Sequence, residues 1–213
     1  ISAGGAGGTA AAIMAAGTEE QKNYFIPGII NGDINFCQGF TEPSGGADLA
    51  SLQCRAVLDG DDFIVNGQKI YTSGAHAATH VYLMVRTDPE APKHRGISIL
   101  LVPMDTPGIT IRPLYSIQND PPAPMGTTYG HKKTNETFYE NIRVPKNALL
   151  GEINMGWYVG AMGLNLDRVG ASRYLLSVRR DEDIVNWIKD NNLGEYDIKE
   201  NETIRDKTAE MWI

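Results

Sequence analysis

Residues 33–151 constrain the fold most, because short β-prone runs alternate there with clusters of turn residues. The runs are rich in β-branched and aromatic side chains and occupy residues 63–65, 70–72, 81–85, 97–102, 109–111 and 137–139. Turn clusters such as Asp59-Gly60-Asp61 and Thr106-Pro107-Gly108 separate them. Strands at this even spacing predict an antiparallel β-barrel or β-sandwich.

Helical patterns flank this stretch on both sides. Residues 1–32 begin with an Ala-rich helix, and Thr18 followed by Gln21 fits a capping box that starts a second one. Pro27 is expected to open a further short helix, which ends at Asn31-Gly32.

Helical periodicity returns after residue 151, from about residue 156 to residue 180, and another helix is expected near Glu200. The sequence therefore predicts an α+β multidomain chain. Residues 1–32 are expected to end an N-terminal helical domain, 33–151 to form the middle β-domain, and 152–213 to begin a C-terminal helical domain. The chain begins with Ile1 rather than Met and stops within a helical pattern, so we expect both outer parts to be truncated.

Composition excludes several classes of function. The formal net charge of −7 argues against nucleic acid or an anionic membrane as the main partner. The chain has no apolar run of about 18 residues, the length that a membrane span needs, and no visible signal peptide. Cys37 and Cys54 have neither CxxC spacing nor a nearby His, so two reduced, buried thiols are expected and no metal site.

Two glycine-rich segments are candidates for ligand binding. Residues 5–10 match G-x-G-x-x-A, but no strand precedes them, so a small-residue helix is favoured over a phosphate site. Residues 36–48 run from an apolar strand into a turn that offers the Thr41 hydroxyl and the backbone amides of Gly45 and Gly46. Such a turn suits the polar edge of a flat heterocycle and an adjoining phosphate. The alternative is that the same residues form an ordinary Gly/Pro turn that binds no ligand.

A third segment offers an aromatic side chain beside a hydroxyl. Asn66-Gly67 is typical of a hairpin turn, and the strand expected after it places Tyr71 and Ser73 on one face. This pair suits a planar cofactor through stacking and a hydrogen bond, while a core tyrosine is the alternative.

The helix after residue 151 carries a stripe of small residues. Its members are spaced by four and three positions: Gly156, Gly160, Gly163, Asp167, Gly170 and Tyr174. Glycine costs a helix interior about 1 kcal/mol relative to alanine, so the stripe indicates close approach by another helix or a slender ligand. Asp167 has no cationic neighbour on its own helix and is either a candidate general base or one half of an interhelical salt bridge.

Taken together, the ordered motifs resemble the acyl-CoA dehydrogenase family over nearly the whole chain. The motifs that carry the resemblance are Gly17-Thr18-Glu19-Glu20-Gln21-Lys22, Gly39-Phe40-Thr41-Glu42-Pro43 through to Asp48, Asn66-Gly67-Gln68-Lys69, Tyr71-Thr72-Ser73, Arg86-Thr87-Asp88-Pro89, Asn135-Glu136-Thr137-Phe138, Arg143-Val144-Pro145, Leu149-Leu150-Gly151-Glu152 and Leu166-Asp167-Arg168.

The resemblance implies an acyl-CoA dehydrogenase-like fold, FAD as cofactor and roles for particular residues. Thr41 would bind the pyrimidine end of the flavin, Tyr71 would stack on the ring, and Ser73 would reach the N5 region. The remaining implied contacts to FAD come from Gln38, Phe40, Gly46, Ala47 and Thr72. The implied contacts to the acyl-CoA come from Ala47, Asn165 and Arg168.

Four positions depart from the family pattern. Tyr71 replaces the usual Trp, Ser73 the usual Thr, and Ala47 the usual Ser. Asp167 lies where some members carry the catalytic Glu, whereas others carry it much later, beyond the end of this chain. The catalytic base is therefore Asp167 or a residue outside this chain.

The resemblance implies α,β-dehydrogenation of an acyl-CoA, with electrons passed to an electron-transfer flavoprotein. It also implies a homo- or hetero-oligomer, a dimer of dimers, located in the bacterial cytoplasm or the mitochondrial matrix. A non-catalytic subunit of a hetero-oligomer and a flavin oxidase or monooxygenase on the same fold are the alternatives. The acyl chain is not identified, and the Pro-rich segment from Ser116 to Lys133 is expected to be a long irregular loop.

Overall fold

The computed structural model describes residues 3–114, 134–169, 171–191 and 201–210, without the side chains of residues 3–6, 166–169, 171–177 and 208. The chain divides into two compact units, Ile1–Asp167 and Arg168–Ile213. The loop expected from Ser116 to Lys133 lies entirely outside the described residues. The expected domain boundaries after residues 32 and 151 stay predictions.

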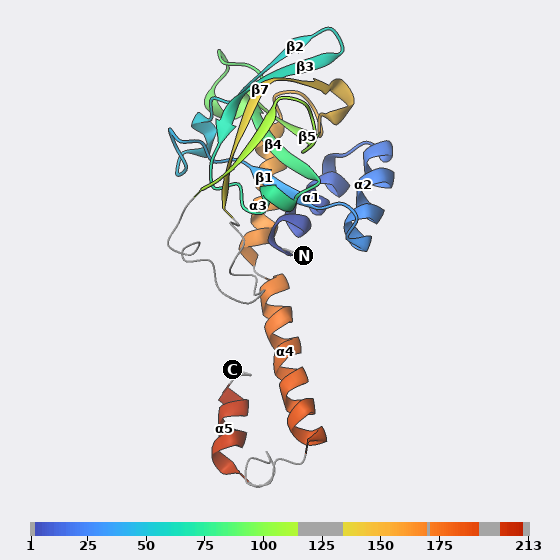
Figure 1. Cartoon of the computed structure of the whole chain (residues 1–213), viewed down its shortest axis with the longest axis vertical. Helices are drawn as coiled ribbons and strands as arrows, with labels where there is room; N and C mark the ends of the chain where they lie inside the picture. The colour runs from blue at the N-terminus through green and yellow to red at the C-terminus, as the bar shows by residue number, and fades with distance from the viewer. Residues whose placement is uncertain (1–2, 115–133, 170, 192–200, 211–213) are drawn as a thin grey trace. The chain divides into compact units, whose positions relative to one another are not determined.

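The first unit is built on one curled sheet (Figure 1). Its strands are β1 (Phe36–Gly39), β2 (Arg55–Asp59), β3 (Asp62–Lys69), β4 (His80–Arg86), β5 (Ile97–Pro103), β6 (Ile109–Pro113) and β7 (Asn135–Pro145). The order is β1-β4-β2-β3-β7-β6, with β5 paired to β4. The sheet is mixed, because β1 runs parallel to β4 while β2 and β3 form an antiparallel hairpin. The predicted fold class is confirmed, but the expected sheet was antiparallel throughout, whereas β4 pairs in parallel with both β1 and β2.

The sequence analysis missed one strand, β2, and wrongly predicted another at residues 70–72. β2 was not anticipated, because four of its five residues are exposed and its sequence shows no alternation of apolar and polar side chains. The run at residues 70–72 is not a strand, because β3 ends at Lys69. Asn66-Gly67 is likewise no hairpin turn and lies inside β3. The tight turn that joins β2 to β3 is at Gly60, which has a φ of +63°.

Two apolar clusters lie on opposite faces of the sheet, and β4 contributes to both. Val81, Leu83 and Val85 belong to one cluster, while Tyr82 and Met84 belong to the other. Successive side chains of a strand point to opposite faces, so a strand that is apolar throughout is buried on both. β4 is therefore the central element that holds β1, β2 and β5 in place.

Helices α1 (Ala3–Ala16), α2 (Glu19–Asn31) and α3 (Gly156–Val169) lie on one side of the sheet (Figure 1). The capping box is confirmed, because the Gln21 N–H donates to Thr18 Oγ1 and the Thr18 N–H donates to Gln21 Oε1. The Gly-rich residues 5–10 lie in α1, as the helix interpretation predicts.

The expectation that Pro27 opens a new helix was wrong, because Pro27 lies inside α2. A proline removes one backbone hydrogen bond from a helix interior, but tertiary contacts hold this helix. Phe25 is buried in the core, and the Gln21 amide donates to the carbonyls of Asn147 and Leu149 at 2.8 and 2.9 Å. The helix ends as expected at Gly32, whose φ is +83°.

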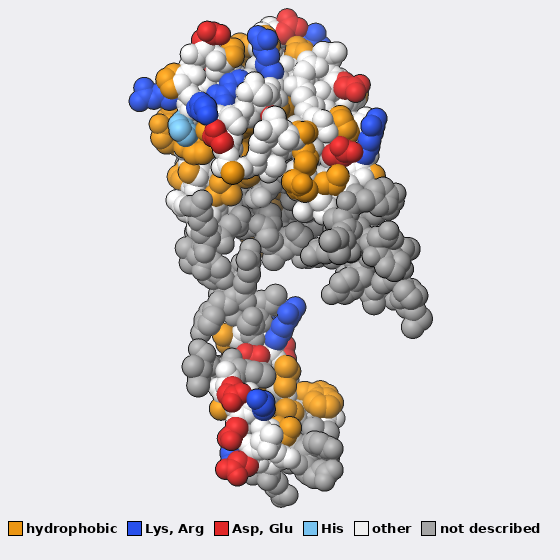
Figure 2. All heavy atoms as spheres, turned by 90° about the vertical axis from the view of Figure 1, so that its left-hand side faces the viewer, with side chains coloured by type: hydrophobic (Ala, Val, Ile, Leu, Met, Phe, Trp, Pro, Cys, Tyr) orange, Lys and Arg blue, Asp and Glu red, His pale blue; other side chains and the backbone are white. Residues whose placement is uncertain are grey.

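The second unit contains α4 (Ala171–Asp190) and α5 (Glu202–Glu210). Ile184 and Trp187 are exposed on α4. No helix within the described ranges is long and apolar enough to cross a membrane. On the face of the first unit drawn in Figure 2, acidic and basic side chains are intermixed, so this face presents no single-sign field.

Candidate functional site

The segment after β1 contains most of the predicted ligand contacts. Gly39 is required where the chain leaves β1, because a Cβ there would lie 2.8 Å from Leu83 Cδ1 and 3.0 Å from Val81 Cγ2. Phe40 then packs on the Tyr82 ring, with centroids 5.5 Å apart, in the helix-side core. Phe40 is thus buried, whereas Gln38 on β1 is half-buried.

A tight turn follows at residues 42–45. The Glu42 N–H donates to Gly45 O, and the Gly45 N–H donates to Glu42 O, at 3.3 and 3.1 Å. This turn leaves Thr41 half-buried and leaves Gly46 and Ala47 exposed. These three predicted contacts are therefore accessible to a ligand, and the Thr41 side chain lies beside Gly46. The Gly45 N–H, which the sequence analysis expected to be open, is instead used within the turn.

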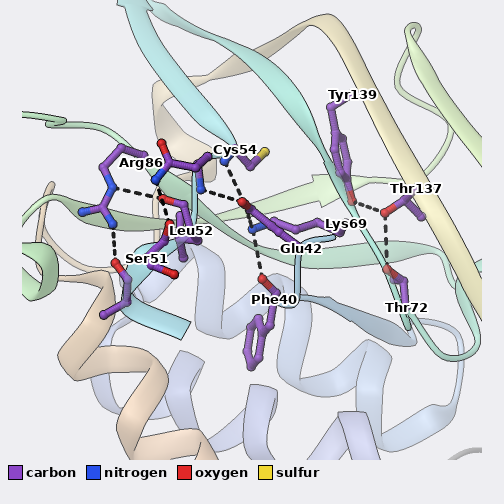
Figure 3. Close-up of polar contacts among 12 residues, drawn as sticks. Phe40, Glu42, Ser51, Leu52, Cys54, Lys69, Thr72, Arg86, Thr137 and Tyr139 are labelled. Carbon is purple, nitrogen blue, oxygen red and sulfur yellow. Dashed lines mark hydrogen bonds and ion pairs between the residues drawn. The ribbon is translucent and has the colours of Figure 1, made fainter. Parts of the chain in front are cut away.

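The turn is joined to the end of β3 by a buried ion pair (Figure 3). Lys69 Nζ lies 2.7 Å from Glu42 Oε1, and the two side chains are 0% and 5% exposed. Lys69 Nζ also donates to Phe40 O at 3.1 Å. Burial is the largest influence on the Lys69 ammonium and lowers its pKa, and the Glu42 carboxylate opposes this shift.

The Glu42 carboxylate also accepts two backbone N–H groups. Cys54 N–H donates to Oε1 at 2.8 Å and Gln53 N–H donates to Oε2 at 2.6 Å. Both oxygens are thereby hydrogen-bonded, as a buried carboxylate requires. Glu42 consequently ties the segment before β2 to the turn and to β3.

Residues 70–73 form the second accessible segment. The Ile70 N–H donates to Thr41 O at 2.9 Å, which sets this segment directly beside the first one. Tyr71 has a φ of +56° and is 61% exposed, and Ser73 is also exposed. They do not share a strand face, because β3 has already ended. The turn nevertheless leaves both predicted side chains accessible.

Thr72 differs from its two neighbours because its side chain is fully buried. Its hydroxyl lies 3.3 Å from that of Thr137, which lies 3.0 Å from the Tyr139 hydroxyl (Figure 3). The Thr72 N–H donates to Asn135 O at 2.8 Å. The Thr72 side chain therefore points into the protein and supports the segment from behind.

Arg86 at the end of β4 fixes the chain between the turn and β2. Its guanidinium donates to the carbonyls of Ala50, Leu52 and Lys93. Lys93 Nζ in turn lies 2.7 Å from Asp48 Oδ2 on the surface and, by its hydrogen bond, lowers the pKa of the Asp48 carboxyl. Both ends of residues 41–48 are thus anchored.

The first three glycines of the α3 stripe, Gly156, Gly160 and Gly163, pack against other elements of the first unit. A Cβ at Gly156 would lie 2.6 Å from the Ser98 carbonyl carbon of β5, and one at Gly163 would lie 2.9 Å from Gly8 O of α1. Gly160 faces the Met84 side chain. Close approach by another helix is confirmed at Gly163, while a strand makes the approach at Gly156.

The predicted substrate and base residues lie at the end of α3. Asn165 is exposed. Asp167 and Arg168 belong to the last turn of the helix, and their side chains lie outside the described residues, as does the side chain of Tyr174. The role of Asp167 therefore stays a prediction.

The two cysteines are free and buried, as predicted. Burial raises the pKa of Cys37 to about 12 and that of Cys54 to about 11. Among the described residues, no cluster of His, Cys, Asp or Glu is arranged to hold a metal ion.

Sequence reasoning missed the supporting residues Glu42, Lys69 and Arg86 as a group. One signal was available for Lys69, because Phe63, Val65 and Lys69 fall on the same side of β3 by alternation and all are buried. A lysine at an inward strand position needs an acidic partner.

Comparison with known proteins gives a consistent result. A family model described as "Acyl-CoA dehydrogenase, middle domain" matches residues 37–128. Acyl-CoA dehydrogenase FadE29 of Mycobacterium tuberculosis is 45% identical over 157 residues, which cover 74% of this chain and 38% of FadE29.

Solved structures match over almost the whole chain. The Tcur3481-Tcur3483 steroid ACAD is 40% identical with a TM-score of 0.70, covering 97% of this chain and 50% of that one. A glutaryl-CoA dehydrogenase from Mycobacterium smegmatis in complex with FADH2 is 27% identical with a TM-score of 0.66, at the same coverage. The chain thus spans about half the length of these structures.

Proposed function

Because the chain belongs to the acyl-CoA dehydrogenase family, we propose that its protein oxidises an acyl-CoA thioester to the 2-enoyl-CoA with FAD as cofactor. The electrons pass to an electron-transfer flavoprotein. The observation that carries the proposal is Tyr71, an exposed aromatic residue at positive φ beside the accessible Thr41 segment.

The backbone of Tyr71 supports a ligand-binding role. A bulky residue at positive φ is a conformational outlier that costs on the order of 1–3 kcal/mol, and such outliers cluster at ligand sites. Tyr71 adopts this strained backbone conformation in a turn, and its aromatic ring faces outward rather than into the core. A buried core tyrosine, the alternative interpretation, does not agree with its 61% exposure.

The accessible groups fit a flavin. The Thr41 hydroxyl and the exposed Gly46 and Ala47 backbone offer polar contacts for a heterocycle edge and a phosphate. Tyr71 offers an aromatic face, and Ser73 offers a hydroxyl nearby. When bound, FAD would supply the acceptor for the hydride that leaves the β carbon. The protein's own part is to align the two reactants and to exclude water.

Asp167 is the candidate base for this reaction. A carboxylate removes the α proton once hydrogen bonds polarise the thioester carbonyl. Asn165 and Arg168 on the same helix are the candidate contacts to the acyl-CoA. If Asp167 is the base, Asp167→Asn abolishes bleaching of the flavin by substrate but leaves FAD binding intact. Unchanged bleaching would assign the role to a residue beyond this chain.

The proposal is tested on the full-length protein, purified with any subunit that accompanies it. We expect a yellow protein whose flavin absorbance is bleached by one class in a panel of straight, branched, cyclic and steroid acyl-CoAs. The steroid thioester belongs in the panel because a related solved structure is a steroid ACAD. A protein that takes up no flavin contradicts the proposal, and rapid oxygen consumption would indicate a flavin oxidase instead.

A non-catalytic subunit of a hetero-oligomer is the second candidate. The related steroid ACAD is named by two protein designations together, Tcur3481-Tcur3483. Ala47, which offers no side-chain hydroxyl at an exposed position of the site, favours this candidate. Flavin bleaching that occurs only when a second subunit is present, and survives Asp167→Asn, would support it.

A further inference from the structure

The two accessible segments of the proposed flavin site meet at the buried pair of Glu42 and Lys69 (Figure 3). Thr41 directly precedes Glu42, and Tyr71 follows two residues after Lys69. Between the segments run the Glu42–Lys69 ion pair at 2.7 Å and the Lys69–Phe40 hydrogen bond at 3.1 Å. The backbone hydrogen bond from Ile70 N–H to Thr41 O adds a third connection at 2.9 Å.

Neither charged side chain is accessible to a ligand. Lys69 is 0% and Glu42 5% exposed at the side chain, and the partners of the pair are backbone groups of Phe40, Gln53 and Cys54. The pair is therefore placed behind the site and acts on it only through the segments that it joins.

We propose that Glu42 and Lys69 are positioning residues for the flavin, which fix the distance between the Thr41 segment and the Tyr71–Ser73 segment. This inference rests on the proposed flavin site. In the proposed site, Thr41 would contact one edge of the planar cofactor and Tyr71 would contact one face. Both contacts can form only if the distance between the two segments stays nearly constant. Supporting groups behind a site serve to hold its contact residues in one geometry.

The physics of buried ion pairs separates positioning from stability. Desolvation of two charges offsets much of their attraction, so replacing both partners by well-packed apolar groups of similar volume is often neutral or stabilising. Gln in place of Glu42 keeps one oxygen that can accept one of the two backbone N–H groups. Such a replacement still removes the short, directional charge-assisted hydrogen bonds. A double replacement should therefore keep the fold and loosen the site.

The test compares two double variants of the full-length protein. Glu42→Gln with Lys69→Met removes the buried pair, and Asp59→Asn with Arg143→Gln removes an exposed pair of 3.0 Å on the same sheet as the matched control. For each apoprotein, FAD affinity is measured by flavin fluorescence, the visible absorbance spectrum of bound FAD is recorded, and folding is checked by circular dichroism.

We expect the buried double variant to bind FAD about 10-fold or more weakly, the scale on which supporting residues behind ligand sites act. Its bound flavin should also show an altered absorbance spectrum, because the ring contacts differently placed groups. The control should match the wild type in both measurements.

A folded double variant with wild-type FAD affinity and an unchanged spectrum would overturn the inference and leave the proposed function intact. Failure of the wild type to bind FAD would overturn the proposed function and the inference with it. Glu42→Asp provides a second test should the double variant not fold, because it keeps both charges and withdraws the carboxylate by one methylene. We expect it to bind FAD more weakly than the wild type, and wild-type affinity here would likewise count against the inference.

Discussion

The two ends of β3 carry ion pairs of the same chemistry in opposite surroundings. At its start, Asp62 and the neighbouring Asp59 meet Arg143 of β7 at 3.5 and 3.0 Å, and the Arg143 and Asp59 side chains are 63% and 60% exposed. At its end, Lys69 meets Glu42 at 2.7 Å with both side chains buried.

The difference between these ends follows from the dielectric environment. Exposed charges interact weakly through water and lose side-chain entropy when they pair, so the net gain is small. Buried charges interact strongly but depend on each other, because either one alone would be left without a counter-charge. One end of β3 is therefore tolerant of change, whereas the other fixes the chain that surrounds the proposed site.

Lys69→Met should have the largest effect on stability. It leaves the Glu42 carboxylate buried with its backbone donors but without its cation. Breaking a buried pair in this way costs about 3–5 kcal/mol. The free energy of unfolding is measured by urea denaturation. It should be higher in the double variant with Glu42→Gln than in Lys69→Met alone, by most of this loss. A single variant as stable as the wild type would remove the contrast between the two ends.

Gly67→Ala should cost about 3 kcal/mol, from overpacking and from backbone strain at the positive φ of +156°. A Cβ at residue 67 would lie 2.7 Å from both Cα and Sγ of Cys54, and the backbone there is held by Glu42. Gly60→Ala at the other end of β3 is the matched control. Its φ is +63° but no atom lies within 4 Å, so only backbone strain of about 1 kcal/mol applies.

Equal losses of unfolding free energy in these two variants would show that the tight packing near Lys69 does not matter. The measurement is again denaturation of the full-length protein, and each variant is compared with the wild type under the same conditions.

The order of strands and helices followed from the sequence wherever local pattern decides the structure. The capping box at Thr18 and the turn at Gly60 are local, and both were predicted. Pro27 was misplaced because Phe25 and Gln21 hold α2 through contacts with distant residues. The end of β3 was misplaced for a related reason, since Ile70 bonds the Thr41 carbonyl instead of continuing the β3–β7 ladder.

The candidate site shows the same division. Accessible residues such as Thr41, Tyr71 and Ser73 could be named from composition and motif resemblance. The partners that hold them could not, because Glu42 contacts Lys69 and Cys54 across 27 and 12 residues of sequence. Long-range pairing of this kind leaves no periodic signal. Only the inward position of Lys69 on its strand pointed to it.

Thr137→Val should cost about 1–2 kcal/mol, the penalty for leaving buried hydroxyl groups without a partner. The Thr137 hydroxyl lies between those of Thr72 and Tyr139, and both neighbours are at most 1% exposed. Thr110→Val on β6 is the control, because Thr110 is exposed. Equal unfolding midpoints for the two variants would show that the buried hydroxyl chain adds nothing to the stability of this end of β3.

Arg143→Gln should have the smallest effect, less than about 1 kcal/mol, because exposed ion pairs contribute little. Arg143 contacts both Asp59 and Asp62, so this one substitution removes both exposed interactions at the start of β3. Salt screens exposed charges, and the Debye length falls to about 3 Å at 1 M ionic strength. The difference between Arg143→Gln and the wild type in urea should therefore vanish at high salt, whereas that caused by Lys69→Met should persist. A salt-insensitive loss as large as that of Lys69→Met would mean that exposure does not distinguish the two ends.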